Sequence, residues 1–135
     1  MWSEDIAPLP PQVVSTLDSD NTQPQHTHYS CIALLTGSLI FHADLVRQLS
    51  VPTIFETVKL SSYGEGTTSS RNVKISKDLD RSIEGKRVLI IEDIIDTGNT
   101  LAWFNKHLES KGATSTEIVC LLNKQCRREV DVAVE

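Results

Sequence analysis

The order of apolar and polar blocks along the chain predicts alternating strands and helices. The apolar run at residues 31–35 predicts a short strand that is buried on both faces. After a polar break, the apolar spacing over residues 39–49 is typical of an amphipathic helix. Residues 53–60 then alternate and are rich in β-branched side chains, which predicts a second strand.

The second half of the chain repeats this order. Residues 87–91 predict the strongest strand, and residues 116–122 predict another apolar strand. Between them, the apolar spacing predicts a helix from about Thr100 to Lys111, with Gly112 at the position of a C-terminal cap. Its inward face is predicted to carry Leu101, Phe104 and Leu108. The repeated β-α-β order indicates an α/β domain with a mainly parallel, Rossmann-like sheet flanked by helices.

Two polar segments interrupt this pattern. Residues 1–29 are rich in proline and show no sustained period, so we expect an irregular or partly disordered segment before a core domain at residues 30–135. Residues 61–72 predict a long polar loop, followed by a short hairpin strand at 73–75. A loop of this length inside a compact domain is usually functional.

Composition narrows the class of protein. The 135 residues carry 13 Lys and Arg against 18 Asp and Glu, and this net charge of -5 argues against a nucleic-acid-binding surface. Cys31, Cys120 and Cys126 lack the spacing of metal ligands and indicate a reducing, cytoplasmic setting. No apolar run approaches the length that spans a bilayer, and the start lacks the basic region of a signal peptide.

The candidate chemistry follows the strongest predicted strand. That strand delivers two adjacent carboxylates, Glu92 and Asp93, to its carboxyl end, where open α/β sheets bind ligands. A hydroxyl-rich turn from Asp96 to Thr100 then opens a helix, and exposed N–H groups at a helix start suit a phosphate. Carboxylates beside a phosphate are expected to hold ribose hydroxyls or Mg²⁺. The alternative is that these side chains only cap the helix, with Asp96 as the N-cap.

The segment VLIIEDIIDTGNTL, residues 88–101, resembles the phosphoribosyl-pyrophosphate (PRPP) signature of the type I phosphoribosyltransferases. Its residues are similar to those of the hypoxanthine-guanine branch. Other parts are similar in order. The motif at residues 34–38 followed by 41–45 resembles that branch's pyrophosphate loop and the helix after it. Residues 61–64 resemble the start of its mobile catalytic loop, and Leu121–Lys124 followed by residues 127–131 resemble its approach to the base.

The resemblance implies the type I phosphoribosyltransferase fold and an enzyme of purine salvage, with the base-binding hood incomplete. Such an enzyme transfers 5-phosphoribosyl from PRPP to hypoxanthine or guanine, giving IMP or GMP and pyrophosphate. Glu92 and Asp93 would hold the ribose hydroxyls directly or through Mg²⁺, and Asp96 would be the general base or acid at the purine N7. The 5′-phosphate would lie in the turn formed by Asp96, Thr97, Gly98, Asn99 and Thr100.

The remaining implied residues lie on three other segments. Backbone N–H groups of Leu35, Thr36 and Gly37 would bind pyrophosphate, helped in the family by a cis peptide bond that a sequence cannot reveal. A lid carrying Ser62 and Tyr63 would exclude water. Lys124 would bind the exocyclic oxygen of a 6-oxopurine. Without the resemblance, Ser62 and Tyr63 would be taken as an exposed loop and Lys124 as a solvated charge.

The sequence also departs from the family. Thr36 stands where the family often has lysine, so a cation near pyrophosphate is lost. The family continues for several dozen residues beyond the equivalent of Glu135, so we expect weak or absent turnover from this chain alone. The alternatives are an inactive fragment, a regulatory PRPP-sensing module, or an adenine or xanthine transferase. The family is commonly a dimer or tetramer, which predicts a homo-oligomer for the complete enzyme.

Overall fold

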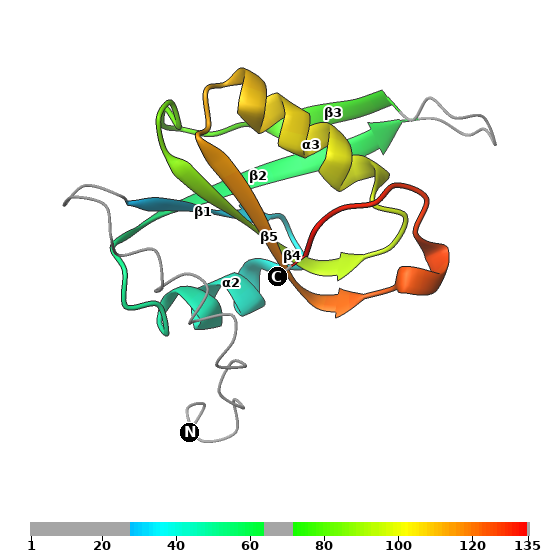
Figure 1. Ribbon diagram of the computed structural model, residues 1–135, viewed down its shortest axis with the longest axis horizontal. Coiled ribbons are helices and arrows are strands. Elements are labelled where there is room, and N and C mark those ends of the chain that lie inside the picture. Colours follow the sequence, from blue (N-terminus) through cyan, green and yellow to red (C-terminus); the bar gives the residue numbers. More distant parts are fainter. Residues whose placement is uncertain (1–27, 64–71, 135) are drawn as a thin grey trace.

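The computed structural model describes residues 28–63 and 72–134. The elements, in chain order, are β1 (Tyr29–Leu34), α2 (Leu39–Val46), β2 (Thr53–Tyr63), β3 (Asn72–Lys77), β4 (Arg87–Ile95), α3 (Asn99–Ser110), β5 (Ser115–Asn123) and the short 3₁₀ helix η1 (Gln125–Arg127) (Figure 1). Apart from its last two positions, the segment predicted to be irregular at residues 1–29 lies outside the described residues. Tyr29 is an exception to that prediction, because it already belongs to β1.

The five strands form one sheet in the order β3-β2-β1-β4-β5. Strands β2, β1, β4 and β5 run parallel, and β3 pairs antiparallel with β2. The central strand β1 is buried along its whole length, as expected for a parallel strand covered on both faces. The predicted α/β architecture with a mainly parallel sheet is therefore confirmed.

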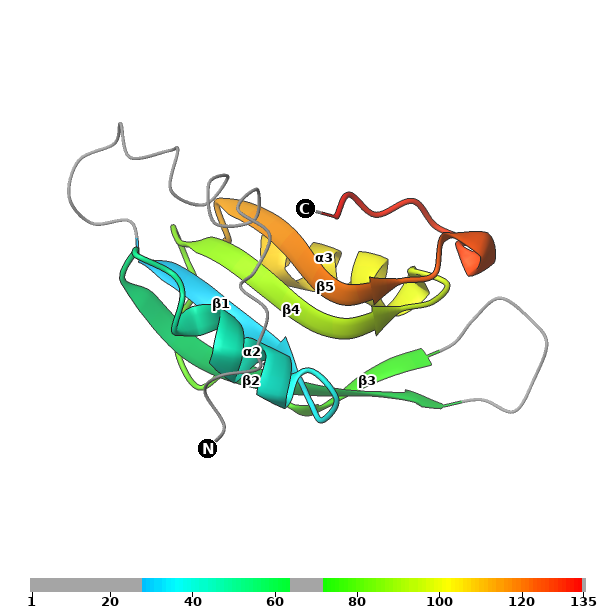
Figure 2. The same ribbon diagram turned by 90° about the horizontal axis from the view of Figure 1, so that it is seen from below.

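The two helices cover opposite faces of the sheet (Figure 2). On the α3 face, the predicted inward residues of the helix are buried in a cluster that includes Ile32, Val58, Ile90, Leu101, Phe104 and Leu108. On the α2 face, a smaller buried cluster comprises Tyr29, Cys31, Leu45, Leu89, Ile91 and Val119. The alternation of side chains along β1 and β4 divides them between these clusters. None of the helices within the described ranges is long and apolar enough to cross a membrane.

The predicted loop at residues 61–72 is wrong at both ends. β2 continues through Tyr63 and β3 begins at Asn72, with Ser62 opposite Val73 and Tyr63 opposite Asn72. These polar residues form strands because the backbone of each finds its hydrogen-bond partners in the other strand. The middle of the predicted loop, residues 64–71, lies outside the described residues.

The strand that carries the acids is also longer than predicted. β4 runs to Ile95, so Glu92 and Asp93 belong to the strand itself and the turn begins only at Asp96. The helix α3 begins at Asn99 and ends at Ser110, each one residue earlier than expected. Gly112 adopts the left-handed conformation (φ 86°) predicted for the C-terminal cap. β4 thereby extends the acid pair to the rim of the sheet.

Candidate functional site

The site lies where the connections between parallel strands change direction. β1 and β4 are neighbours at the centre of the sheet. The chain leaves β1 through α2 toward β2, and it leaves β4 through α3 toward β5 on the other side. At such a point the segments that follow the two strands diverge and bound a crevice. Here those segments are residues 35–38 and 96–98.

The first of these segments is in contact with the acid pair. A Cβ atom placed on Gly37 would lie 2.0 Å from Oδ2 of Asp93 and 2.6 Å from its Cγ. Any larger residue at position 37 would displace the Asp93 side chain. The structure therefore brings together the predicted pyrophosphate loop and the predicted ribose-binding acids.

The predicted pyrophosphate loop is tied to the sheet by two hydrogen bonds. The Leu35 N–H donates to the Val58 carbonyl oxygen at 2.8 Å, and the buried Ser38 hydroxyl donates to the Leu34 carbonyl at 2.6 Å. The Leu35–Thr36 peptide bond is cis, as the resemblance implied. Thr36 and Gly37 are exposed at the tip of this loop.

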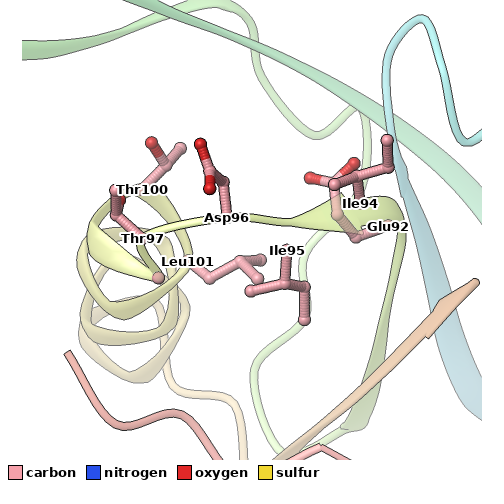
Figure 3. Close-up of a pocket in the computed structure, with 8 residues that line it drawn as sticks. Glu92, Ile94, Ile95, Asp96, Thr97, Thr100 and Leu101 are labelled. Carbon is pink, nitrogen blue, oxygen red and sulfur yellow. The ribbon is translucent and has the colours of Figure 1, made fainter. Parts of the chain in front are cut away.

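A pocket of about 220 Å³ opens at the carboxyl end of β4 and the first turn of α3 (Figure 3). In this view the carboxyl groups of Glu92 and Asp96 and the hydroxyl of Thr100 lie on the same side of the chain. The lining residues are Glu92, Ile94, Ile95, Asp96, Thr97, Gly98, Thr100 and Leu101. Five of the predicted site residues therefore share one pocket.

The turn before α3 leaves the start of the helix without a side-chain cap. The helix N-cap is Gly98, which has φ 86° and whose carbonyl accepts the Ala102 N–H at 2.9 Å. The alternative that Asp96 caps the helix is wrong, because the cap residue is a glycine and has no side chain to offer. The Asn99 N–H makes only a long contact of 3.4 Å with the Thr97 hydroxyl. The positive end of α3 thus faces the pocket without a carboxylate cap.

The acid pair differs in ionisation. Burial raises the pKa of Glu92 to about 8, and the hydrogen bond between its carboxyl and the Asp93 carboxyl adds to that shift. The same hydrogen bond, outweighing burial, lowers the pKa of Asp93, whose carboxylate also accepts the Ile94 N–H at 2.8 Å. Asp93 is therefore the stronger acid of the pair. A cation at this rim would favour the anionic form of both carboxyls.

Asp96 has a cationic neighbour that sequence reasoning missed. The Nε of Arg127, in η1, lies 3.3 Å from Oδ1 of Asp96. The contact is an ion pair without hydrogen-bond geometry, and Oδ1 has no hydrogen-bond partner among the described residues. Both side chains are substantially exposed, so the pair contributes at most about 1 kcal/mol to stability. Asp96 thus remains free to exchange this partner for a ligand.

The segment after β5 holds the loop of residues 96–99 in place. Backbone N–H groups of Glu129 and Val130 both donate to the Thr97 carbonyl, at 2.9 and 3.1 Å. The Asn99 side-chain amide donates to the Glu129 carboxylate at 2.6 Å. The charged run that begins at Arg127 was the only sequence signal for these contacts. Its role depends on a chain reversal that local sequence does not specify.

Lys124 lies at the same rim, although it is not among the residues that line the pocket. Its N–H donates to the Ile95 carbonyl at 2.9 Å, and its side chain is exposed. At the same rim, Ile94 lines the pocket and Leu122 is its register partner on β5; their side chains are 39% and 54% exposed. This half-exposed apolar pair was not selected from the sequence. The only sequence signal for this pair was an apolar residue, Ile94, directly after the acid pair.

The comparisons with known proteins agree with this arrangement. A family model, the phosphoribosyl transferase domain, matches residues 20–135. The fold and the rim site define a phosphoribosyltransferase, and the chain belongs to this family.

Within the family, similar relatives of this chain include hypoxanthine and hypoxanthine-guanine phosphoribosyltransferases. The hypoxanthine phosphoribosyltransferase of Haemophilus influenzae is 50% identical over 104 residues, which cover 77% of this chain and 58% of that protein. The hypoxanthine-guanine phosphoribosyltransferase of Mycobacterium tuberculosis is 47% identical over 93 residues, 69% of this chain and 46% of that protein. A crystal structure of the Staphylococcus aureus hypoxanthine phosphoribosyltransferase matches with a TM-score of 0.81 and 39% identity, over 92% of this chain and 66% of that one.

These structural matches confirm the type I phosphoribosyltransferase fold expected from the resemblance. The chain spans at most 58% of the length of the curated relatives just described.

Proposed function

We propose that this chain binds PRPP with Mg²⁺ and transfers its 5-phosphoribosyl group to hypoxanthine or guanine, giving IMP or GMP and pyrophosphate. The observation that carries this proposal is the direct contact between Gly37 and Asp93. That contact sets residues 35–37, the proposed pyrophosphate loop, beside the acids that would hold the ribose. The pocket at the start of α3 adjoins the same acids through Glu92. A sugar with phosphates at both ends matches this order of groups.

The 5′-phosphate would bind in the turn formed by Asp96, Thr97, Gly98, Asn99 and Thr100. Support comes from the positive end of α3, the small Gly98 and the absence of a carboxylate cap at this helix end. At the opposite end of the ligand, Leu35, Thr36 and Gly37 would bind pyrophosphate through backbone N–H groups. The exposed tip of that loop supports this role.

The acid pair suits a Mg²⁺ ion that is shared with the substrate. No group of three or more His, Cys, Asp or Glu side chains that could enclose a metal occurs within the described ranges. Mg²⁺ is commonly held by one or two carboxylates, with substrate oxygens and water as its other ligands. Glu92 and Asp93 would be those carboxylates, directly or through water. When bound, the ion would neutralise negative charge on the pyrophosphate that leaves.

The purine would lie against the apolar pair Ile94 and Leu122, with Lys124 beyond it. Lysine has only donors, so it can donate to the oxygen of a 6-oxo group but not to the 6-amino group of adenine, which is itself a donor. This preference is the reason to propose hypoxanthine or guanine as the base. It also sets aside an adenine transferase.

Asp96 would be the residue that moves a proton. As the N-glycosidic bond forms between the ribose C1 and the purine, and the bond from C1 to pyrophosphate breaks, the Asp96 carboxylate would accept the purine N7 proton. Its position at the start of the turn, with Oδ1 held by the exposed ion pair with Arg127 and by no hydrogen bond among the described residues, supports this role. Ser62 and Tyr63 would belong to a lid that excludes water from the reacting carbon.

Two broader features belong to the same proposal. All three cysteines are free thiols, which supports a reducing, cytoplasmic setting. A homo-oligomer, dimer or tetramer, is proposed for the complete enzyme. The relatives are named as transferases, so no observation favours the alternative of a regulatory PRPP-sensing module.

The test is titration calorimetry with PRPP in the presence and absence of Mg²⁺. We expect binding that depends on Mg²⁺ and weakens at least about tenfold in Asp93→Asn, because one charge that holds the ion and ribose is lost. Asp80→Asn is the matched control, since Asp80 is 75% exposed, pairs with Lys77 at the end of β3 and does not line the pocket. Equal binding by Asp93→Asn and the parent would contradict the proposed site.

Transfer itself is tested by IMP formation from PRPP and hypoxanthine. We expect slow turnover at high protein concentration that Asp96→Asn abolishes. PRPP binding with no IMP formed under any condition would limit the function to binding.

A further inference from the structure

Arg128 lies behind the loop that precedes α3. A Cβ atom placed on Gly98 would be 3.2 Å from both Cδ and Nη1 of Arg128. Gly98 lines the pocket, whereas Arg128 does not. The guanidinium therefore reaches the loop from the side where a residue-98 side chain would project, outside the ligand pocket. A ligand in the pocket would be near its charge without contacting it.

The position of Arg128 is fixed by its surroundings. Its Nη2 donates to the side-chain oxygen of Asn123, at the end of β5, and its backbone N–H donates to Gln125 at 3.1 Å. The next two residues donate their N–H groups to the Thr97 carbonyl. The side chain is therefore held by a strand end on one side and by the loop on the other.

Within residues 28–63 and 72–134, no carboxylate forms an ion pair with Arg128. Its Nη1 is buried and has no hydrogen-bond partner in the described part of the chain. The neighbouring arginine, Arg127, pairs instead with Asp96, and the carboxylate of Glu129 accepts the Asn99 amide. A partly buried cation without a counter-charge is costly, and a nearby anion would relieve that cost.

We propose that Arg128 is a positioning residue that holds the 96–99 loop and attracts the 5′-phosphate by its charge, without contact. The inference rests on the proposed function, because it assumes that this loop binds the phosphate. Arg128 would also supply a cation to a site whose proposed pyrophosphate loop has Thr36 in place of lysine.

The experiment compares Arg128→Met, which keeps the length of the chain, with Arg128→Lys, which keeps the charge. Binding of ribose 5-phosphate and of inorganic pyrophosphate is measured by calorimetry at low and at high ionic strength. We expect Arg128→Met to bind ribose 5-phosphate about five- to tenfold more weakly at low salt, and Arg128→Lys to recover part of the loss. The difference should shrink at high salt, because screening weakens a charge effect. Pyrophosphate binding should change less.

Arg47→Met is the matched control, since Arg47 follows α2, is 68% exposed and pairs with Asp44. Thermal unfolding of each variant checks the fold, and Arg128→Gln repeats the test if the methionine variant does not fold. Equal ribose 5-phosphate binding by parent and Arg128→Met would overturn the inference. So would a loss that neither salt nor lysine changes, because that result indicates packing alone. A parent that binds neither PRPP nor ribose 5-phosphate would instead overturn the proposed function.

Discussion

Gly37 lies so close to Asp93 that a Cβ atom at position 37 would be 2.0 Å from Oδ2 of the carboxylate. The contact joins the turn after β1 to the last residues of β4. Because Asp93 ends in a flexible side chain, a substitution at Gly37 would move the carboxylate and leave the fold in place.

Gly37→Ala is therefore expected to disable one end of the site. The displaced Asp93 would no longer hold its position beside the pyrophosphate loop, so PRPP affinity in Mg²⁺ should fall at least about tenfold. Ribose 5-phosphate, which keeps its phosphate contacts in the turn before α3, should lose less affinity than PRPP. Calorimetry with both ligands checks this. Equal loss for the two would indicate general disruption and contradict the local explanation.

Gly98→Ala is expected to damage both fold and site. Its φ of 86° disfavours alanine, and the new Cβ would lie 2.6 Å from the backbone oxygen of Val130. The combined cost should be about 1–3 kcal/mol in the free energy of unfolding, with loss of ribose 5-phosphate binding. Gly112→Ala is a matched control, because its φ is also 86° but its nearest contact is the flexible side chain of Glu84 at 3.1 Å. That variant should lose stability yet bind normally once folded.

Glu92 should make stability depend on pH. Its pKa is about 8 in the folded chain, mainly through burial, against 4.5 when exposed. The folded state therefore holds the proton over this range, and the stability that Glu92 contributes is complete below pH 4.5 and is lost as pH rises toward 8. Glu92→Gln should remove this decline in denaturant unfolding at successive pH values. Parallel curves for parent and variant would show that Glu92 does not titrate in this window.

His42 should make stability depend on pH in the opposite direction. The ring is fully buried, stacks on Phe55 with centroids 4.2 Å apart, and has no hydrogen-bond partner for either nitrogen in the described chain. Burial lowers its pKa from 6.5 to about 4, so stability is present above pH 6.5 and is lost as pH falls toward 4. The loss could reach roughly 3 kcal/mol. His42→Leu should flatten the acid limb of the unfolding curve; an unchanged limb would contradict this.

Much of the site could be predicted because it is local in sequence. Val88 to Leu101 contains the strand, the acids, the turn and the first turn of a helix, and each step follows from residue type and spacing. The strand β2 was underestimated because Ser62 and Tyr63 are polar, and only their pairing with β3 makes them a strand. The partners of Asp96 and Gly98, Arg127 and Arg128, come from beyond β5. No local pattern specifies which loop a distant arginine will meet.

The pairing of β1 with β4 has a consequence for folding. Cys31 lies opposite Leu89, 58 positions later in the chain, and this pairing unites the turn after β1 with the turn after β4. The two halves of the site therefore exist together only after a long loop has closed, a step that slows folding in proteins with distant contacts. A ligand that bridges both turns can bind only the closed form. Such a ligand should therefore stabilise the whole domain, and the melting temperature should rise with the ligand concentration.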